Sequence, residues 1–353
     1  MKKVLITGGT GCIGAATAAA LAGPPPTPSR KGRGDTRAEF NVDEIILLSR
    51  SGQSGLLDLW FPQGLDKRIK LLRGDIADPA VLRTLLHAQR PTHIVHLAAF
   101  QTPDCDAYPG RGMEINVGGT LQLLSAAAEL ASAGALERVV FASSAAVYGK
   151  RSLYPGATVK ETDALAPPNL YGVWKVAGEH LARQFQEKTG VPTVCLRLNT
   201  TYGPGRDRGK TSAPTTALKA VAWGAHRGSP CPYRMPYCGR ENYHYVADVG
   251  AHFALCALEP FAGFGVFNIR GRTVEVREFL ELARRVAGEL GMGGTVDLGL
   301  ADNAQAGLFV CDLDDEAIRR AFPGVPCTPL EEGIRSSLEA FARLAQNGKL
   351  KGV

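Results

Sequence analysis

The sequence predicts an α/β fold: a doubly wound parallel sheet of about seven strands with a smaller, discontinuous C-terminal lobe. Short aliphatic and β-branched runs alternate with longer segments of helical periodicity, which is the pattern of successive β-α-β units. The runs are almost continuously apolar, as in residues 45–48, and such strands lie in sheets that helices cover on both faces. A glycine-rich turn separates the first strand from the first helix.

The expected strands lie near residues 3–7, 44–49, 69–73, 93–97, 138–143, 192–198 and 265–269. The expected helices lie near residues 12–22, 79–88, 112–134, 171–189, 212–225, 248–258, 275–290, 314–321 and 330–346. After residue 199 the alternation weakens, and Gly, Pro and aromatic residues become frequent over 203–245. We therefore expect a sheet domain of residues 1–198 plus about 246–277, and a second lobe of about 199–245 plus 278–353.

Residues 23–37 form the one low-complexity segment, between the first helix and the second strand. Three consecutive prolines end the helix, and the remainder is predicted to be a mobile loop. A helix-to-strand connection lies at the amino ends of the strands, whereas ligands of doubly wound sheets bind outside the carboxyl ends. We therefore do not expect the arginines of this segment to bind a cofactor.

The composition excludes several classes of protein. The 353 residues are 45% hydrophobic and 21% charged, and the net charge of +6 is mild, so a globular protein with a sizeable core is expected. The densest basic run, residues 30–37, lacks interleaved aromatic residues, so no nucleic-acid partner is predicted. Eight cysteines occur without a CxxC pair or zinc-type spacing, which predicts a reducing compartment and no metal site. With neither a signal peptide nor a membrane-length apolar run, we expect a cytoplasmic protein.

A Gly-x-x-Gly-x-x-Gly pattern follows the first strand and runs directly into an alanine-rich helix. In this position the pattern predicts dinucleotide binding: Gly8 permits a tight turn, Gly11 lets the backbone approach a pyrophosphate, and Gly14 lets helix and strand pack closely. The helix N-terminus adds amide donors and a favourable dipole. Cys12 and Ile13, at the start of this helix, are further candidate cofactor contacts.

The second strand ends in Ser49 and Arg50, where an acidic residue would bind the 2′-hydroxyl of NAD. No carboxylate is present there to repel a 2′-phosphate, and the planar guanidinium of Arg50 can bind one. The sequence therefore favours NADP over NAD. The alternative is that Arg50 faces solvent and either cofactor is accepted.

A tyrosine and a lysine four residues apart, Tyr171 and Lys175, open a helix after the fifth strand ends in Ser143 and Ser144. Side chains at this spacing share one helix face. Tyrosine titrates near pH 10, and a nearby ammonium favours the phenolate; a shift of about three units is worth roughly 4 kcal/mol. A Tyr-x-x-x-Lys pair alone is common on helix surfaces, but after the glycine turn and the serine-rich strand end it predicts acid/base chemistry beside a nicotinamide.

With these motifs the chain resembles the extended short-chain dehydrogenases/reductases, a Rossmann-type group that includes sugar-nucleotide epimerases and dehydratases. The resemblance covers most of the chain and extends to residues 74–76, 96–99, 115–120, 196–198, 202–205 and 245–249. It implies that Tyr171 is the acid/base, that Lys175 binds the nicotinamide ribose, and that Ser144 orients the substrate oxygen.

The resemblance also implies further cofactor contacts. Asp75 and Ile76 would meet the adenine, and Leu97, Ala98 and Ala99 would pass near the pyrophosphate and ribose. Asn116 would lie in a helix kink behind the site, and Thr200 is a further candidate contact. A homodimer joined through the helices near 112–134 and 171–189 is implied as well.

The chain departs from the sugar-nucleotide members at positions that concern the substrate. Thr200 stands where those members usually carry an asparagine that holds a phosphate, with Asn199 one residue earlier. Glu241 stands where they usually carry an arginine, with Arg240 beside it. The dehydratases have an Asp-Glu pair directly after the catalytic hydroxyl residue, whereas this chain has two alanines, 145 and 146, which transfer no proton.

We therefore expect an NAD(P)-dependent dehydrogenase or reductase that acts on a polar, hydroxyl-rich small molecule such as a sugar, sugar acid or polyol. Two alternatives remain: a sugar or NDP-sugar epimerase that retains the keto intermediate, and a non-catalytic NAD(P)-sensing protein. Segment 205–245 is predicted to line the substrate pocket, although each of its polar residues could equally be a surface residue. The candidate substrate contacts are Gln101, Ser144, Asn199, Arg234, Arg240, Tyr243 and His244.

Overall fold

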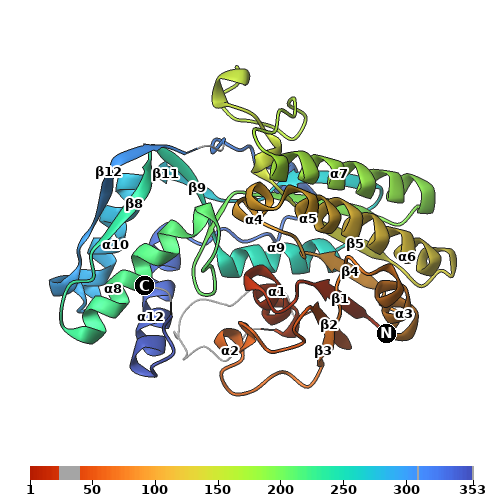
Figure 1. Cartoon of the computed structure of the whole chain (residues 1–353), viewed down its shortest axis with the longest axis horizontal. Helices are drawn as coiled ribbons and strands as arrows, with labels where there is room; N and C mark the ends of the chain where they lie inside the picture. The colour runs from red at the N-terminus through yellow and green to blue at the C-terminus, as the bar shows by residue number, and fades with distance from the viewer. Residues whose placement is uncertain (24–39, 308–309, 352–353) are drawn as a thin grey trace.

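A computed structural model describes residues 1–23, 40–307 and 310–351. Its main feature is a seven-stranded, all-parallel sheet with the order β10-β6-β5-β4-β1-β2-β3 (Figure 1). The strands are β1 (Lys3–Thr7), β2 (Glu44–Ser49), β3 (Ile69–Arg73), β4 (His93–His96), β5 (Arg138–Ser144), β6 (Thr193–Leu198) and β10 (Phe264–Asn268). The predicted α/β fold and its strands are confirmed, including the return of the strand near 265–269 to the main sheet.

Helices cover both faces of this sheet, and consecutive residues of the central strand pack on opposite sides. Val4 and Ile6 of β1 share a core with α1 (Cys12–Ala22), α9 (Val246–Leu258) and α11 (Glu316–Ala321). Leu5, between them, shares a second core with α3 (Pro79–Gln89), α6 (Thr120–Ser132) and α7 (Leu170–Thr189). This burial on both faces is the reason that the strands read as continuous apolar runs.

The order of the strands positions a crevice. The chain leaves β1 toward β2 on one side, whereas β4 and the later strands lie on the other side of β1, so the connections diverge above the carboxyl ends of β1 and β4. Ligands of doubly wound sheets bind at this switch point.

The long helix expected near 112–134 is interrupted. It consists of α5 (Pro109–Met113), a π-helical segment at Glu114–Gly119 and α6. The side chain of Asn116, in the π-helical segment, accepts a hydrogen bond from the backbone N–H of Phe100 at 2.7 Å and donates one to its carbonyl at 3.0 Å. This link to a distant loop accompanies the irregular turn, and helical periodicity alone does not reveal it.

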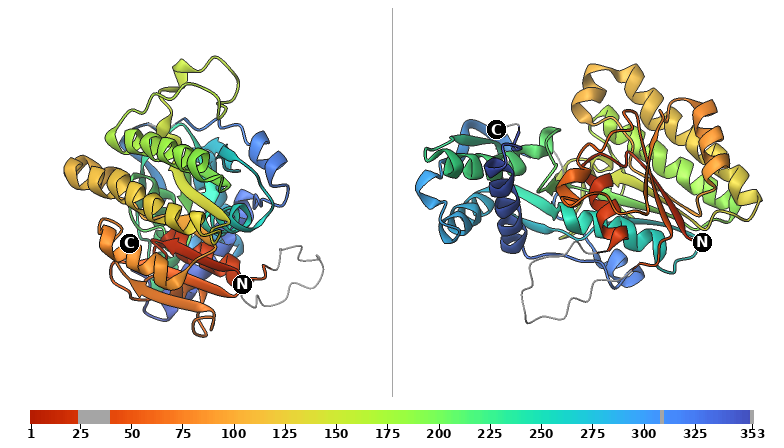
Figure 2. Two further views of the ribbon diagram at one scale, coloured as in Figure 1. Left: turned by 90° about the vertical axis from the view of Figure 1, so that its right-hand side faces the viewer. Right: turned by 90° about the horizontal axis from the view of Figure 1, so that it is seen from below.

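The second lobe contains α8 (Ala213–Arg227), α10 (Val276–Glu289) and α12 (Leu330–Gln346) and lies at the end of the molecule away from the N-terminus (Figures 1 and 2). Two small sheets accompany them, made of β11 (Arg272–Glu275), β9 (Arg240–Tyr245) and β7 (Thr200–Tyr202), and of β12 (Leu298–Ala306) and β8 (Tyr233–Cys238). None of these strands is predicted from the sequence, because four of them are only three to six residues long and two, β8 and β12, include Pro236 and Gly299.

The packing also refines the expected boundary between the lobes. Ile318, Phe322 and Val325 lie in a stretch that the sequence assigned to the second lobe, yet they pack in the core beneath the main sheet.

The remaining regular elements are α2 (Leu57–Trp60) and α4 (Thr102–Ala107), with 3-10 turns at Ala145–Val147, Arg151–Leu153, Lys210–Ser212 and Gly293–Thr295.

The predicted loop at 23–37 lies almost entirely outside the described residues, and so do its arginines. No helix within 1–23, 40–307 or 310–351 combines the length and hydrophobicity that crossing a membrane requires. In the same ranges, no group of three or more Cys, His, Asp or Glu side chains is arranged to hold a metal ion.

Candidate active site

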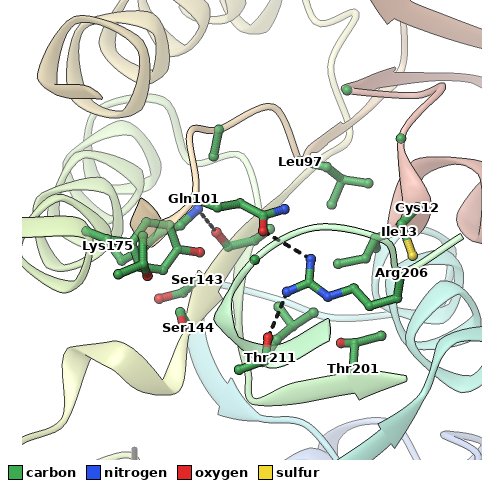
Figure 3. Close-up of a pocket in the computed structure, with 18 of the residues that line it drawn as sticks. Cys12, Ile13, Leu97, Gln101, Ser143, Ser144, Lys175, Thr201, Arg206 and Thr211 are labelled. Carbon is green, nitrogen blue, oxygen red and sulfur yellow. Dashed lines mark hydrogen bonds between the residues drawn. The ribbon is translucent and has the colours of Figure 1, made fainter. Parts of the chain in front are cut away.

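A cavity of about 280 Å³ lies at the carboxyl ends of β1, β4 and β5, between the main sheet and the second lobe (Figure 3). It collects the glycine turn, the loop after β4, the end of β5, the first turns of α7 and part of segment 198–211. The predicted site residues that line it are Gly8, Gly11, Cys12, Ile13, Gly14, Leu97, Ala98, Ala99, Gln101, Ser144, Tyr171, Lys175 and Asn199.

The glycine turn is built so that the backbone approaches closely. Gly8 has φ of +69°, and a Cβ there would lie 3.0 Å from the backbone nitrogen of Ala98. A Cβ on Gly14 would lie 2.3 Å from the carbonyl oxygen of Gly8, so only glycine lets α1 start this close to the turn. Gly11 is the N-cap of α1, whose free amides therefore open beside the cavity. This arrangement fits a dinucleotide pyrophosphate.

The helix that carries Tyr171 is held tightly against the end of β5. Asn169 caps α7 by accepting a hydrogen bond from the N–H of Gly172 at 2.9 Å. A Cβ on Gly172 would lie 2.1 Å from the carbonyl oxygen of Ala146, so the first turn of α7 packs directly on the turn after Ser144. The phenol of Tyr171 and the hydroxyl of Ser144 consequently line the same cavity, close enough for Ser144 to lower the pKa of the phenol.

Lys175 is directed inward beneath this pair. Its ammonium donates to the carbonyl oxygen of Ala142 at 2.6 Å and lies 5.5 Å from the centre of the Tyr171 ring (Figure 3). It also lies 4.9 Å from the centre of the Phe141 ring. The predicted sharing of one helix face by Tyr171 and Lys175 is thus present in the structure.

Burial opposes the charged forms of both groups. It raises the pKa of Tyr171 to about 12, and the positive charge of Arg206 and the hydrogen bond from Ser144 act against this rise. It lowers the pKa of Lys175 to about 8. The sequence had assigned a lowering of the tyrosine pKa to Lys175 and the positive nicotinamide ring, whereas in the structure burial raises this pKa and the cation that acts against the rise is Arg206. The reason is that Arg206 comes from a segment 35 positions later in the chain and reaches the phenol only through the fold.

A hydrogen-bonded network lies directly behind the site. The Ser143 hydroxyl donates to Oε1 of Glu179 at 2.5 Å, and Arg197 donates to both carboxylate oxygens of Glu179 at 2.8 Å. Arg197 also donates to the Tyr148 hydroxyl at 2.7 Å, which in turn donates to Oδ1 of Asn268 at 2.8 Å. The network ties α7 to β5, β6 and β10, and so it restrains the helix that carries Tyr171 and Lys175.

A buried histidine organises the other wall of the cavity. Nδ1 of His96 lies 2.7 Å from the hydroxyl of Thr7, and its Nε2 lies 3.0 Å from the hydroxyl of Thr120. The Thr7 hydroxyl also accepts from the backbone N–H groups of Leu97 and Ala98 at 3.2 Å. The end of β1 thereby determines the path of the loop after β4, where the resemblance places cofactor contacts.

The residues expected at the adenosine end lie outside the cavity but at the same edge of the sheet. Ser49 and Arg50 end β2; the Ser49 hydroxyl accepts from the N–H of Gly52 at 3.1 Å, and Arg50 is exposed. Asp75 follows β3 and accepts a hydrogen bond from Arg111 at 3.3 Å. Ile76 is buried. Asn116 lies behind the loop after β4 in the π-helical segment, as the resemblance led us to expect.

The two arginines predicted to contact the substrate, Arg234 and Arg240, lie outside the cavity. Arg234 is paired with Asp297 at 2.7 Å on an exposed part of β8, and Arg240 is paired with Asp312 at 2.7 Å. Neither lines the cavity.

Three other candidates are buried in the second lobe, outside the cavity. Tyr243 stacks on Phe279 with ring centres 4.6 Å apart, and His244 is hydrogen-bonded to Asn242. Thr200 is fully buried on β7. Most of segment 205–245, predicted to line the pocket, instead forms α8, β8 and β9, because its apolar and aromatic side chains build the core of this lobe.

The cavity also contains residues that were not among the sequence candidates. Thr201, Arg206, Gly209 and Thr211 line it, all close to the Tyr-Gly-Pro-Gly segment at 202–205. Arg206 donates hydrogen bonds to Oε1 of Gln101 at 3.2 Å and to the Thr211 hydroxyl at 2.8 Å (Figure 3). The sequence did contain a signal for Arg206, because this arginine directly follows the motif and stands at the start of the segment predicted to line the pocket.

The structure shows the surroundings of Asn199 and Glu241, which lie where the chain departs from the sugar-nucleotide members. The side-chain amide of Asn199 donates to the carbonyl oxygen of Val310 at 2.7 Å. Glu241 is buried, and this burial raises the pKa of its carboxyl group to about 7. The sugar-nucleotide members usually carry an arginine at this position, whereas this chain has an acid in the interior of the second lobe.

A family model for the NAD dependent epimerase/dehydratase family matches residues 4–269. The chain belongs to this family. The D-erythronate dehydrogenase of Cupriavidus necator is 32% identical over 290 residues, which cover 81% of this chain and 82% of that protein. A UDP-glucose 4-epimerase of Halalkalibacterium halodurans is 27% identical and covers 81% of this chain and 80% of its own length.

Two solved epimerase structures have the same fold as this chain. The UDP-glucose 4-epimerase of Thermus thermophilus in complex with NAD superimposes with a TM-score of 0.72 at 25% identity, covering 96% of this chain and 98% of that one. The UDP-glucose 4-epimerase of Thermotoga maritima gives a TM-score of 0.75 at 22% identity over 97% and 99% of the two chains, a likeness in fold.

Membership of this family confirms the predicted resemblance. The protein is an NAD(P)-dependent enzyme of the extended short-chain dehydrogenase/reductase type, and its chemistry is hydride transfer between a nicotinamide and a secondary alcohol or ketone. The glycine turn and the amides at the start of α1 are the residues of this chain that fit the cofactor.

Proposed function

We propose that the protein is a dehydrogenase or reductase of a small, polar, polyhydroxylated molecule, and that Ser144, Tyr171 and Lys175 carry its chemistry. The supporting observation is that the Tyr171 phenol and the Ser144 hydroxyl face one cavity with the glycine turn. The nicotinamide, when bound, supplies or accepts the hydride.

Each protein residue has a distinct part. The Ser144 hydroxyl binds the oxygen of the substrate alcohol or ketone and keeps it beside the phenol. Tyr171 is a neutral phenol near neutral pH, because its pKa is raised to about 12, so it can donate a proton to the ketone oxygen during reduction. In the oxidative direction it accepts the alcohol proton, and the positive charge of Arg206 favours the phenolate that precedes this transfer. Lys175, anchored on Ala142, restrains the tyrosine and is available to a ribose hydroxyl.

A dehydrogenase is favoured over a nucleotide-sugar epimerase by the substrate side of the site. Glu241 is a buried acid where the epimerases usually carry an arginine, and Asn199 is hydrogen-bonded to Val310. Neither residue offers a cationic contact for a diphosphate. The D-erythronate dehydrogenase of Cupriavidus necator, 32% identical, acts on a sugar acid by its name. Ala145 and Ala146, both buried, provide no acid or base for dehydration.

The decisive experiment follows the absorbance of the reduced cofactor. The purified enzyme is offered aldonates, uronic acids, sugars and sugar nucleotides, with NAD and NADP in parallel. A dehydrogenase forms reduced cofactor in proportion to substrate consumed. An epimerase interconverts sugars with no net change in absorbance, and this outcome would reject our assignment. Tyr171→Phe should retain cofactor binding but lose about 10²- to 10⁴-fold in kcat, since it removes the acid/base group. Unaltered biological output of this variant would point instead to a cofactor-sensing protein.

We further propose a preference for NADP. Arg50 is exposed at the carboxyl end of β2, and Arg73 pairs in register with Ser49 at the end of β3. Two guanidinium groups at neighbouring strand ends favour a 2′-phosphate over a 2′-hydroxyl. Arg50→Asp should lower the ratio of kcat/KM for NADP to that for NAD at least about tenfold, by repelling the phosphate. An unchanged ratio would show that Arg50 does not select the cofactor.

We also propose a cytoplasmic homodimer that pairs through α6 and α7, which lie side by side (Figures 1 and 2). Leu121 on α6 is 45% exposed, and Leu170 and Val173 on α7 are 41% and 44% exposed. Apolar side chains in such an arrangement are typical of interface cores. Light scattering of the wild type and of Leu121→Asp should give the mass of a dimer and of a monomer respectively.

A further inference from the structure

We propose that Arg206 binds a carboxylate of the substrate, so that the enzyme acts on a sugar acid of the aldonate class rather than on a neutral sugar or polyol. This inference rests on the proposed function and adds the group that selects the substrate. It concerns a residue that lines the same cavity as Ser144 and Tyr171.

The charge of the cavity wall is the first observation. Among the described residues that line the cavity there are two cations, Lys175 and Arg206, and no carboxylate. The ammonium of Lys175 is already directed at the carbonyl oxygen of Ala142, 2.6 Å away. The guanidinium of Arg206 therefore gives the wall of the cavity a positive charge, which an anionic ligand would complement.

The hydrogen bonds of Arg206 are the second observation. Its two terminal nitrogens donate to the amide oxygen of Gln101 and the hydroxyl of Thr211, which are both neutral. Its Nε is buried and has no acceptor within the described parts of the chain. A partly buried guanidinium without a counter-ion is costly, and a carboxylate can satisfy it through two parallel hydrogen bonds. The side-chain amide of Gln101 and the hydroxyl of Thr211 are further donors at this spot.

The position of Arg206 relative to the reacting groups is the third observation. Arg206 lines the same cavity as Tyr171 and Ser144, and its hydrogen bonds to Gln101 and Thr211 hold the guanidinium in that cavity. A carboxylate held by Arg206 would thus place the adjacent carbinol carbons of a short acid near Ser144 and Tyr171. When bound, the oxidised nicotinamide would accept the hydride from the carbinol carbon, and Tyr171 in its phenolate form would accept the hydroxyl proton. The carboxylate itself is unchanged.

The pyrophosphate of the cofactor is the other oxyanion that could meet Arg206. The amides at the start of α1 and the glycine turn already form a pyrophosphate cradle. Arg206 comes from the segment after β7 and donates to Gln101 and Thr211, which are not part of that cradle (Figure 3). We therefore assign the guanidinium to the substrate, and the experiment below separates the two anions.

The experiment measures binding and turnover separately. Calorimetry on the Tyr171→Phe enzyme, saturated with its oxidised cofactor, compares D-erythronate with the matched neutral polyol erythritol. We expect the acid to bind and the polyol to bind at least about tenfold more weakly. Adding Arg206→Gln should weaken binding of the acid at least about 30-fold, because a desolvated partner of a charge pair is removed. Arg206→Lys should lose less, since it keeps the charge but not the planar fork.

The controls identify what each result means. Arg234→Gln removes an arginine that is paired with Asp297 outside the cavity, and it should leave binding of the acid unchanged. Cofactor affinity measured without substrate should be the same, within about twofold, for wild type and Arg206→Gln. Melting temperatures of the variants exclude misfolding as the cause. The proposal is overturned if Arg206→Gln weakens cofactor binding alone, if it leaves binding of the acid intact, if erythritol binds as well as erythronate, or if the acid does not bind.

Failure of the proposed function would look different. In that case the acid would bind in an Arg206-dependent manner, yet the enzyme with an intact Tyr171 would form no reduced cofactor from any aldonate tested.

Discussion

At the scale of single residues, the reacting groups are held in surroundings that disfavour their charges. Burial raises the pKa of Tyr171 to about 12 and lowers that of Lys175 to about 8. The ammonium is retained through its bond to the Ala142 carbonyl and its approach to the Phe141 ring. The protonation of Lys175 is thus coupled to the folding of the protein as well as to the geometry of the active site.

This coupling predicts a pH-dependent stability. The folded pKa of Lys175 is about 8 and its ordinary value is 10.5, so between these values the unfolded chain binds more protons and stability rises with pH. The free energy of unfolding of the wild type, relative to that of Lys175→Met, should therefore increase by about 2 kcal/mol from about pH 7.5 to about pH 10. Urea unfolding of both proteins at the two pH values measures the difference. A constant or falling difference would contradict the expected cost of the buried ammonium.

At the scale of elements, two helix starts carry the site. The start of α1 is kept close to β1 by glycine, and the start of α7 is kept on the end of β5 by the Asn169 cap and by Gly172. Both depend on a few local contacts. Their loss should therefore affect the site more than the rest of the fold.

Gly14→Ala tests the first helix start. Its Cβ would lie 2.3 Å from the carbonyl oxygen of Gly8, so the turn must move. We expect a loss of about 1–3 kcal/mol in the free energy of unfolding and at least a tenfold weaker affinity for the cofactor. Gly288→Ala, on an exposed part of α10 with nothing within 4 Å of the new Cβ, is the matched control. It should stabilise the protein by about 0.5–1 kcal/mol through helix propensity and leave cofactor affinity unchanged.

Asn169→Ala tests the second helix start, that of α7. Loss of the cap should cost about 1 kcal/mol and let the first turn of α7 fray, which displaces Tyr171 and lowers kcat. Asp78 caps α3 by accepting from the N–H groups of Ala80 and Val81 at 3.0 and 3.1 Å, and α3 contributes nothing to the cavity. Asp78→Ala should therefore reduce stability similarly in chemical unfolding but leave kcat unchanged. Equal effects of the two variants on kcat would rule out a specific role of the α7 cap.

At the scale of the whole molecule, buried histidines link both lobes to pH. Burial lowers the pKa of His96 and His244 to about 3, and that of His93 and His252 to about 4. His93 and His96 lie on β4, His244 lies on β9 and His252 on α9. The native protein keeps all four neutral, whereas the unfolded chain protonates them near their ordinary pKa of 6.5.

Acid should therefore destabilise the fold. Between about pH 6.5 and pH 4.5 the unfolded chain binds more protons, so the free energy of unfolding should fall by several kcal/mol as the pH is lowered. His252→Gln should fall by about 2 kcal/mol less than the wild type over this interval, because one of the four groups is removed. His180→Gln, at an exposed position on α7, should follow the wild type. Parallel curves for all three proteins in urea titrations would disprove the contribution of His252.

The sequence by itself determined the parallel sheet, the glycine turn and the Tyr171–Lys175 pair. Each of these is written within a few neighbouring residues, as an apolar run, a glycine spacing or a four-residue helical interval, so that local pattern is enough. The tertiary structure alone decided the rest. The contact of Arg206 with Gln101 joins residues 105 positions apart, and the hydrogen bond of Asn116 with Phe100 lies in a helix kink that the resemblance implied but periodicity did not show. Tyr243 and His244 are polar in sequence yet buried in the lobe core, because their burial depends on partners such as Phe279 that come from distant parts of the chain.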